Sequence, residues 1–117
     1  MFRDKLESKK GISLSGNACV VCGWDEKNVK GESLVIGAHA RPLRGTTDYD
    51  KRDNIFALCP NHHTEYDVGN LTIDPTNLLC IHINSKNPYH LKKIIGKVDH
   101  IQKGYFDYHR KNIFNKK

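Results

Sequence analysis

The sequence predicts a small α+β domain, and three observations predict it. In residues 34–39, Leu34, Ile36 and Ala38 would face one side of a strand and the residues between them the other, and residues 55–58 (IFAL) form a second short apolar run, so both segments are expected to be strands. Pro60 and Gly69 then bracket a helix, because proline suits the first helical turn and glycine the position just past the last one. The charged residues 40–54 between the strands predict a loop, and a loop of this length is usually functional.

Further elements are expected on both sides of this strand–loop–strand–helix unit. Residues 2–9 can form a short amphipathic helix, followed by a loop over residues 11–17. Residues 71–74 and 79–83 flank turn residues and predict a β-hairpin. After Pro88, apolar side chains at helical spacing predict a C-terminal helix. These side chains are Leu91, Ile94, Ile95, Val98, Ile101, Tyr105 and Tyr108.

The chain is expected to be one soluble domain spanning residues 1–117. Hydrophobic residues make up 38% of it and charged residues 27%, an ordinary composition for a folded domain. The first ten residues lack the apolar core of a signal peptide, and no stretch approaches the roughly 20 apolar residues of a membrane span. We therefore expect a cytoplasmic protein without a membrane partner. Its motif core covers about residues 19–74, and a basic helical tail covers about residues 86–117.

The positive charge is concentrated near the C-terminus. The formal net charge is +6, and residues 86–117 contain nine Lys or Arg against Asp99 and Asp107. Basic residues interleaved with aromatic ones suit contact with a polyanion, because neutralising phosphates releases counterions. A solvated basic helix face is the alternative interpretation of the charge taken alone.

Two pairs of metal-ligand residues have matching two-residue gaps. Cys19 and Cys22 form the first pair, and Cys59 and His62 form the second. Such gaps let both members of a pair reach one ion, and Cys3His is a common ligand set for a structural Zn²⁺ site. A disulfide or a redox Cys-x-x-Cys is the alternative, but a redox motif would usually open a helix in a βαβ unit. Cys80 has no partner at ligand spacing and is expected to be a buried thiol.

Three polar residues, at the end of the first predicted strand, at the end of the loop and in the helix, are separated by characteristic numbers of residues. His39 is followed after fourteen residues by Asn54, and Asn54 after eight residues by His63. This pattern resembles HNH endonucleases of the ββα-metal, or His-Me finger, superfamily, particularly the restriction-endonuclease-like branch. The resemblance implies an α+β ββα-metal (HNH) finger with the Cys3His zinc site, an additional β-hairpin and a C-terminal helix. Its motifs are Ala38-His39-Ala40-Arg41-Pro42, residues 54–63 and Tyr66-Asp67-Val68-Gly69, and the ending YFDYHRKNIF is also similar.

The resemblance implies a role for each of these residues. His39 corresponds to the general base, and a neutral imidazole can take a proton from water near neutral pH. Asn54 cannot ionise and suits an orienting role that ties the loop to its own backbone. His63 corresponds to a ligand of a catalytic Mg²⁺ or Mn²⁺ ion. Asp67 lies four residues later on the same helix face, where it would supply an oxygen ligand.

The chain departs from the family pattern at one position. Many relatives carry Asp or His directly before the base, where the side chain binds the metal, whereas this chain has Ala38. His63, Asp67 or a carboxylate of the loop must then complete the metal site together with water. The loop carboxylates are Asp48, Asp50 and Asp53.

The resemblance finally implies a metal-dependent endonuclease that hydrolyses DNA phosphodiester bonds in a restriction or similar defence role. Arg41, Arg44 and Arg110 are candidate contacts to nucleic acid, although such arginines are as often solvated. A homodimer is expected as the simplest way to cut both strands with one site per chain. The alternative is a catalytically inactive zinc-containing nucleic-acid-binding module, because Ala38 cannot bind a metal.

Overall fold

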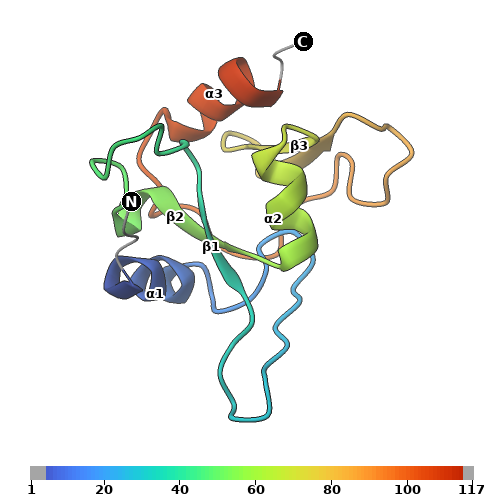
Figure 1. The fold of residues 1–117 in the computed structure, drawn as a ribbon. Helices are drawn as coiled ribbons and strands as arrows, with labels where there is room; N and C mark the ends of the chain where they lie inside the picture. The colour runs from blue at the N-terminus through green and yellow to red at the C-terminus, as the bar shows by residue number, and fades with distance from the viewer. Residues whose placement is uncertain (1–4, 115–117) are drawn as a thin grey trace.

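The computed structural model describes residues 5–114 and has two small antiparallel sheets with helices around them (Figure 1). One sheet pairs β1 with β2 and the other pairs β3 with β4, which confirms the predicted α+β class. In chain order the elements are α1 (Lys5–Leu14), β1 (Ile36–His39), the 3-10 helix η1 (Arg52–Asn54), β2 (Ile55–Leu58), α2 (Pro60–Asp67), β3 (Leu71–Asp74), β4 (Leu79–His82), α3 (Tyr105–His109) and the π-helix η2 (Arg110–Phe114).

β1, β2 and α2 form the centre of the molecule and confirm the strand–loop–strand–helix prediction. His39 is the last residue of β1 and lies opposite Ile55, the first residue of β2. All four residues of β2 are buried, since both α1 and α2 contact this strand. α2 begins at Pro60, and Gly69, with φ +85, follows its end as expected. His39 lies at the end of β1, which pairs with β2, and α2 follows β2 directly, so the three elements form one unit.

α1 differs from its prediction because it continues through residues expected to form a loop. The loop was predicted over residues 11–17, yet the helix runs to Leu14. Gly11 is buried, and a Cβ at this position would lie 2.6 Å from the Cβ of Ile55. Glycine therefore serves here for close packing of α1 on β2 and does not end the helix. The start of the predicted helix, residues 2–4, lies outside the described residues.

The predicted hairpin is confirmed as β3 and β4, but most of the predicted C-terminal helix is not helical. Residues 83–104 form turns and irregular backbone, and among the described residues after Pro88 helix is present only in α3 and η2. The backbone N–H groups of Ile95 and Gly96 both donate to the carbonyl of Val20. These tertiary hydrogen bonds use donors that a helix would need, so the apolar spacing alone led to a wrong prediction.

An aromatic contact joins the layers of the core. The ring of Phe56 in β2 meets both Tyr66 of α2 and Phe106 of α3 edge to face, with 5.2 Å between centroids in each pair. Burial of these large side chains therefore holds α2 and α3 against the same strand. Within residues 5–114, no helix is both long enough and apolar enough to cross a membrane.

Candidate functional site

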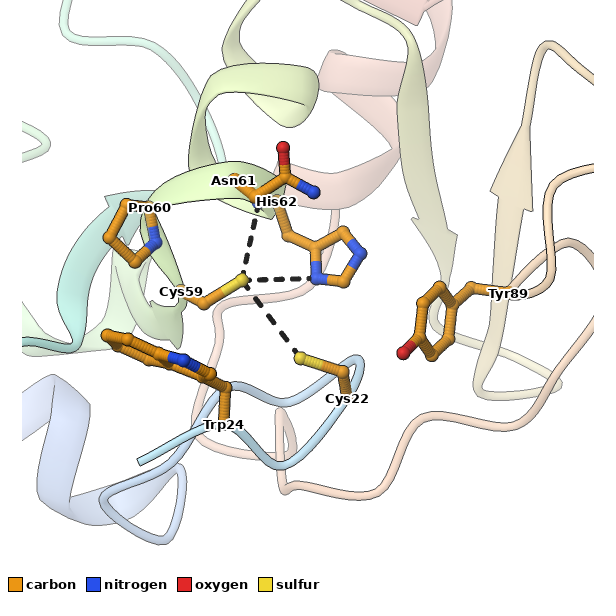
Figure 2. Close-up of a pocket in the computed structure, with 7 residues that line it drawn as sticks. All are labelled: Cys22, Trp24, Cys59, Pro60, Asn61, His62 and Tyr89. Atoms are coloured by element: carbon orange, nitrogen blue, oxygen red, sulfur yellow. Dashed lines mark hydrogen bonds between the residues drawn. The ribbon is translucent and has the colours of Figure 1, made fainter. Parts of the chain in front are cut away.

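Three cysteines and one histidine form a compact cluster where the turn after α1 meets the start of α2; Figure 2 shows three of them. Nδ1 of His62 lies 3.3 Å from Sγ of Cys59 and 3.6 Å from Sγ of Cys19. Sγ of Cys22 lies 4.0 Å from Sγ of Cys59, and all four ligand atoms lie within 4.8 Å of one another. A tetrahedral zinc ion spaces such donors about 3.3–3.8 Å apart. The predicted Cys3His set is therefore assembled and could bind zinc.

Local hydrogen bonds shape the turn that carries Cys19 and Cys22. The backbone N–H of Gly23 donates to the carbonyl of Cys19, and Gly23 has a φ of +79, which favours glycine. The N–H of Val20 donates to the carbonyl of Ala57 in β2. The turn is therefore fixed to the strand that leads into the second ligand pair.

Cys59 belongs to both the cluster and α2. It is the N-cap of α2, and its Sγ accepts the backbone N–H of His62 at 3.4 Å. Burial raises the pKa of the Cys19 and Cys59 thiols and lowers the pKa of His62, so desolvation favours uncharged donors. A bound cation would offset the charge of deprotonated thiols. All four cysteines are free thiols, and Cys80 is buried as predicted.

A pocket of about 410 Å³ opens beside this cluster (Figure 2). The ring of Tyr89 meets His62 edge to face, with 5.0 Å between centroids, and Trp24 lines the pocket near Pro60. Both aromatic rings are half-buried and pack against the core. Trp24 therefore packs beside the cluster.

Asn54 is fully buried and ties the loop over residues 40–54 together. Its Oδ1 accepts the backbone N–H of Arg41 at 2.8 Å, and its Nδ2 donates to the carbonyls of Arg41 at 2.9 Å and Tyr49 at 2.8 Å. Its own carbonyl accepts the N–H of Ala40 at 2.9 Å. One carboxamide thus joins both ends of the loop, which is the geometry expected of an orienting residue.

His39 is buried at the end of β1, and a carboxylate of the loop holds its ring. Nε2 of His39 lies 2.8 Å from Oδ1 of Asp50, and the two side chains are 8% and 3% exposed. Within the described residues, Nδ1 of His39 makes no hydrogen bond. Asp50 was expected only as one of three carboxylates that could complete a metal site. The structure instead pairs it with the candidate base.

α2 presents the other two candidate residues on one face. Nε2 of His63 lies 3.1 Å from Oδ2 of Asp67, with the side chains 19% and 52% exposed. The hydroxyl of Tyr66 donates to the carbonyl of Ala40 at 2.7 Å. This bond anchors α2 to the residue directly after His39, so the two halves of the candidate site are held together.

The three candidate arginines have different surroundings. The guanidinium carbon of Arg41 lies 4.3 Å from the ring centroid of Tyr49 and 4.0 Å from that of Tyr108. Arg44 is exposed in the loop, with a φ of +53. Arg110 forms an ion pair of 3.0 Å with the carboxylate three residues before it. Arg41 therefore makes cation–π contacts with two rings and is not a freely solvated loop cation.

Sequence reasoning missed two features of this region. It did not connect Asp50 with His39, and it did not single out His109. His109 is buried, stacks on Tyr66 at 3.6 Å between centroids, and contacts the carbonyl of Tyr66 through Nε2 at 2.7 Å. Its Nδ1 lies 2.9 Å from the hydroxyl of Thr72, and burial lowers its pKa to about 4. The aromatic ending YFDYHRKNIF was the one available signal for His109.

β1, β2 and α2 form a ββα unit that carries a Cys3His cluster, and a comparison with known protein families matches the segment that contains this unit. Residues 19–74 match a family model described as HNH endonuclease, which confirms the resemblance over that segment. No curated protein is similar enough to count as a match. One solved structure, titled "Modification dependent TagI restriction endonuclease", is similar with a TM-score of 0.72 and 29% identity. The similarity covers 97% of this chain but 39% of that one, so this chain spans less than half of that structure.

Proposed function

We propose that this chain is a metal-dependent endonuclease domain that hydrolyses DNA phosphodiester bonds, with His39 as the general base. The observation that carries the proposal is that α2, bearing His63, is anchored by Tyr66 to Ala40, directly beside His39. Asn54 closes the loop that starts at the same point. The HNH endonuclease match over residues 19–74 supports nuclease chemistry at this arrangement.

His63 and Asp67 are the residues that would hold the divalent cation. They place an imidazole nitrogen and a carboxylate oxygen 3.1 Å apart and partly exposed, and Mn²⁺ or Mg²⁺ accepts such donors with water as the remaining ligands. Ala38 is fully buried and offers no ligand, and Asp50 is bonded to His39. When bound, the ion would neutralise charge on a phosphate oxygen and on the leaving 3′ oxygen.

The protein's own groups would carry the proton. The imidazole of His39 takes a proton from water as the water oxygen forms a bond to phosphorus. The P–O3′ bond breaks, and the 3′ oxygen receives a proton from solvent, which leaves a 5′-phosphate and a 3′-hydroxyl. Asn54 keeps the loop and the end of β1 in place during this step, so His39 does not have to be ordered when the substrate binds.

The Cys3His cluster would hold a structural Zn²⁺ ion. Cys59 directly follows β2 and His62 opens α2, so an ion bound there would fix the direction in which α2 leaves the strand. Cys19 and Cys22 would attach the preceding turn to the same ion. The ion would therefore stabilise the frame that carries His63 without contacting the substrate.

The substrate we propose is DNA in a restriction-like setting in the cytoplasm. The similar solved structure is titled a modification-dependent restriction endonuclease, at 29% identity over 97% of this chain. Arg41, Arg44 and Arg110, with the basic C-terminal residues, supply positive charge for the phosphate backbone. Cutting both strands would be done by two copies of the chain, each with one site.

A plasmid-nicking assay tests the proposal. Wild type is expected to nick DNA with Mn²⁺ or Mg²⁺ and not with a chelator, and His39→Ala is expected to lose on the order of 100-fold or more in rate. His90→Ala is the matched control, because His90 lies outside the site and should leave the rate unchanged. Thermal unfolding and zinc content should be the same in all three proteins.

Absence of metal-dependent nicking by folded, zinc-loaded wild type would overturn the enzyme proposal. DNA binding without cleavage would then favour the nucleic-acid-binding module, for which Ala38 is the specific observation.

A further inference from the structure

We propose that Asp50 is the positioning residue of the base: its carboxylate selects the imidazole tautomer that leaves Nδ1 of His39 able to accept the proton from water. The inference rests on the proposed function, since it concerns how His39 acts. Its basis is the 2.8 Å contact between Nε2 of His39 and Oδ1 of Asp50.

The chemistry of the two groups determines which nitrogen carries hydrogen. An ionised carboxylate only accepts hydrogen bonds, and a neutral imidazole has one N–H. Nε2 of His39 must therefore be the protonated nitrogen, and the lone pair lies on Nδ1. Within the described residues Nδ1 has no hydrogen-bond partner, so this lone pair is not used by the fold.

Asp50 also matters after the proton has moved. Proton transfer to Nδ1 turns His39 into an imidazolium, and the Asp50 carboxylate then faces a positive charge at hydrogen-bond distance. Both side chains are less than one-tenth exposed, so water screens this attraction little. The same contact thus orients the neutral ring and stabilises the charged one.

The loop holds Asp50 rigidly against His39. Nδ2 of Asn54 binds the carbonyl of Tyr49, the residue before Asp50, at 2.8 Å, and the backbone N–H of Asp50 donates to the carbonyl of Thr47 at 3.0 Å. Asn54 therefore acts on the base through Asp50 as well as through the backbone next to β1. Asn54 thus helps to orient the His39 ring, because it holds the backbone next to Asp50, whose carboxylate contacts that ring.

Asp48 provides the contrast within the same loop. It is exposed, and no hydrogen bond joins its carboxylate to the described residues, whereas Asp50 is buried and bonded to His39. Asp48→Asn changes the net charge of the loop as Asp50→Asn does. It is therefore the matched control for any effect of charge alone.

The tautomer can be read without any activity. Long-range ¹H–¹⁵N spectra of the full chain, with the His39 signals identified by their loss in His39→Ala, should show hydrogen on Nε2 and a bare Nδ1 in wild type and in Asp48→Asn. In Asp50→Asn the amide can donate to Nε2 instead, so the Nδ1-protonated form should become populated. A wild-type ring protonated on Nδ1 would overturn the inference.

Nicking kinetics supply the second readout. At saturating Mn²⁺ we expect Asp50→Asn to lose roughly 10- to 1,000-fold in rate, with the acid limb of its pH–rate profile displaced to lower pH, while Asp48→Asn stays within twofold of wild type. Asp50→Glu, which retains the carboxylate, should recover part of the loss. Asp50→Asn must keep the unfolding midpoint and zinc content of Asp48→Asn for the comparison to hold.

The outcomes separate this inference from the proposed function. If wild type fails to nick DNA, the proposed function is wrong, and the spectra still decide which nitrogen Asp50 selects. If wild type nicks DNA and Asp50→Asn matches it in rate and pH profile, Asp50 is not a positioning residue. Recovery of the Asp50→Asn rate by a higher Mn²⁺ concentration would identify Asp50 as a metal ligand and would also overturn the inference.

Discussion

His109 lies flat on Tyr66, and the bonds of its imidazole link α3 to α2 and β3. Nε2 is bonded to the carbonyl of Tyr66, and Nδ1 lies 2.9 Å from the hydroxyl of Thr72. The hydroxyl of Tyr66 in turn binds Ala40, next to the candidate base His39. Through its stacking on Tyr66, His109 therefore supports the helix that is bonded beside the candidate site.

The burial of His109 predicts that acid destabilises the fold. Its pKa is lowered to about 4 by burial, whereas an unfolded histidine titrates near 6.5, so between these pH values the unfolded chain binds more protons. The contribution of neutral His109 is complete above about pH 6.5 and is lost as pH falls to about 4, by about 3 kcal/mol in total. Denaturant unfolding at pH 7 and pH 5 should show a smaller difference in His109→Gln than in wild type.

His90→Gln is the control for this measurement, because His90 is half-buried and does not stack on Tyr66. It should keep the pH dependence of wild type. Equal pH dependence in wild type and His109→Gln would show that another group dominates acid unfolding.

Among the elements, the junction between β2 and α2 depends on the Cys3His cluster. The strand ends at Leu58, Cys59 caps the helix, and His62 lies in its first turn, so two of the four ligands come from four consecutive residues. The other two come from a turn that is hydrogen-bonded to β2. The short helix α2 has a small apolar face of its own, so we expect a bound ion to contribute much of its stability.

Removal of the ion should therefore unfold or loosen this junction. We expect a zinc chelator to lower the thermal midpoint by on the order of 10 °C or more, and Cys19→Ala to lose zinc and show a similar midpoint. Cys80→Ala is the control, because Cys80 is as buried as Cys19 but lies outside the cluster. It should keep about one zinc per chain by metal analysis.

A Cys19→Ala protein that retained stoichiometric zinc would contradict the proposed ligand set. A chelated wild type with an unchanged midpoint would show that α2 is held by its packing alone.

At the scale of the whole molecule, the C-terminal segment returns to the loop beside the candidate site. The Arg41 guanidinium carbon lies 4.0 Å from the ring centroid of Tyr108 in α3 and 4.3 Å from that of Tyr49 in the loop. Within the described residues no carboxylate pairs with this guanidinium. Stacking fixes its plane, and its N–H groups stay available for a phosphate.

Arg41 should therefore contribute to DNA binding more than a loop arginine that is not stacked. We expect Arg41→Gln to weaken DNA binding about 3- to 10-fold and to reduce the slope of log K against log salt by about one. Fluorescence anisotropy with a labelled duplex in chelator, at several salt concentrations, measures both. Arg44→Gln, an exposed arginine of the same loop, should have the smaller effect.

Equal affinity and salt slope for Arg41→Gln and wild type would assign Arg41 a purely structural role. In that case the phosphate contacts would lie among the other basic residues.

The sequence alone determined the elements whose signals are local. The apolar run IFAL forms β2, and the segment bracketed by Pro60 and Gly69 contains α2. The two pairs of ligand residues, each with a two-residue gap, form the Cys3His cluster. Each of these depends on neighbouring residues or on a spacing that chemistry restricts, so the residues themselves carry the information. The order of His39, Asn54 and His63 likewise carries the resemblance to HNH endonucleases, and residues 19–74 match that family model.

Only the tertiary structure decided which distant groups meet. Apolar spacing after Pro88 predicted a helix, but bonds from Ile95 and Gly96 to Val20 placed irregular backbone there. The pairing of Asp50 with His39 was also beyond the sequence, because the loop contains three aspartates and its path is set by hydrogen bonds from Asn54. The residues in these contacts are not related by a helix or strand periodicity or by a fixed sequence spacing. The contacts form because the complete fold packs in one way, and this cannot be seen in a local stretch of sequence.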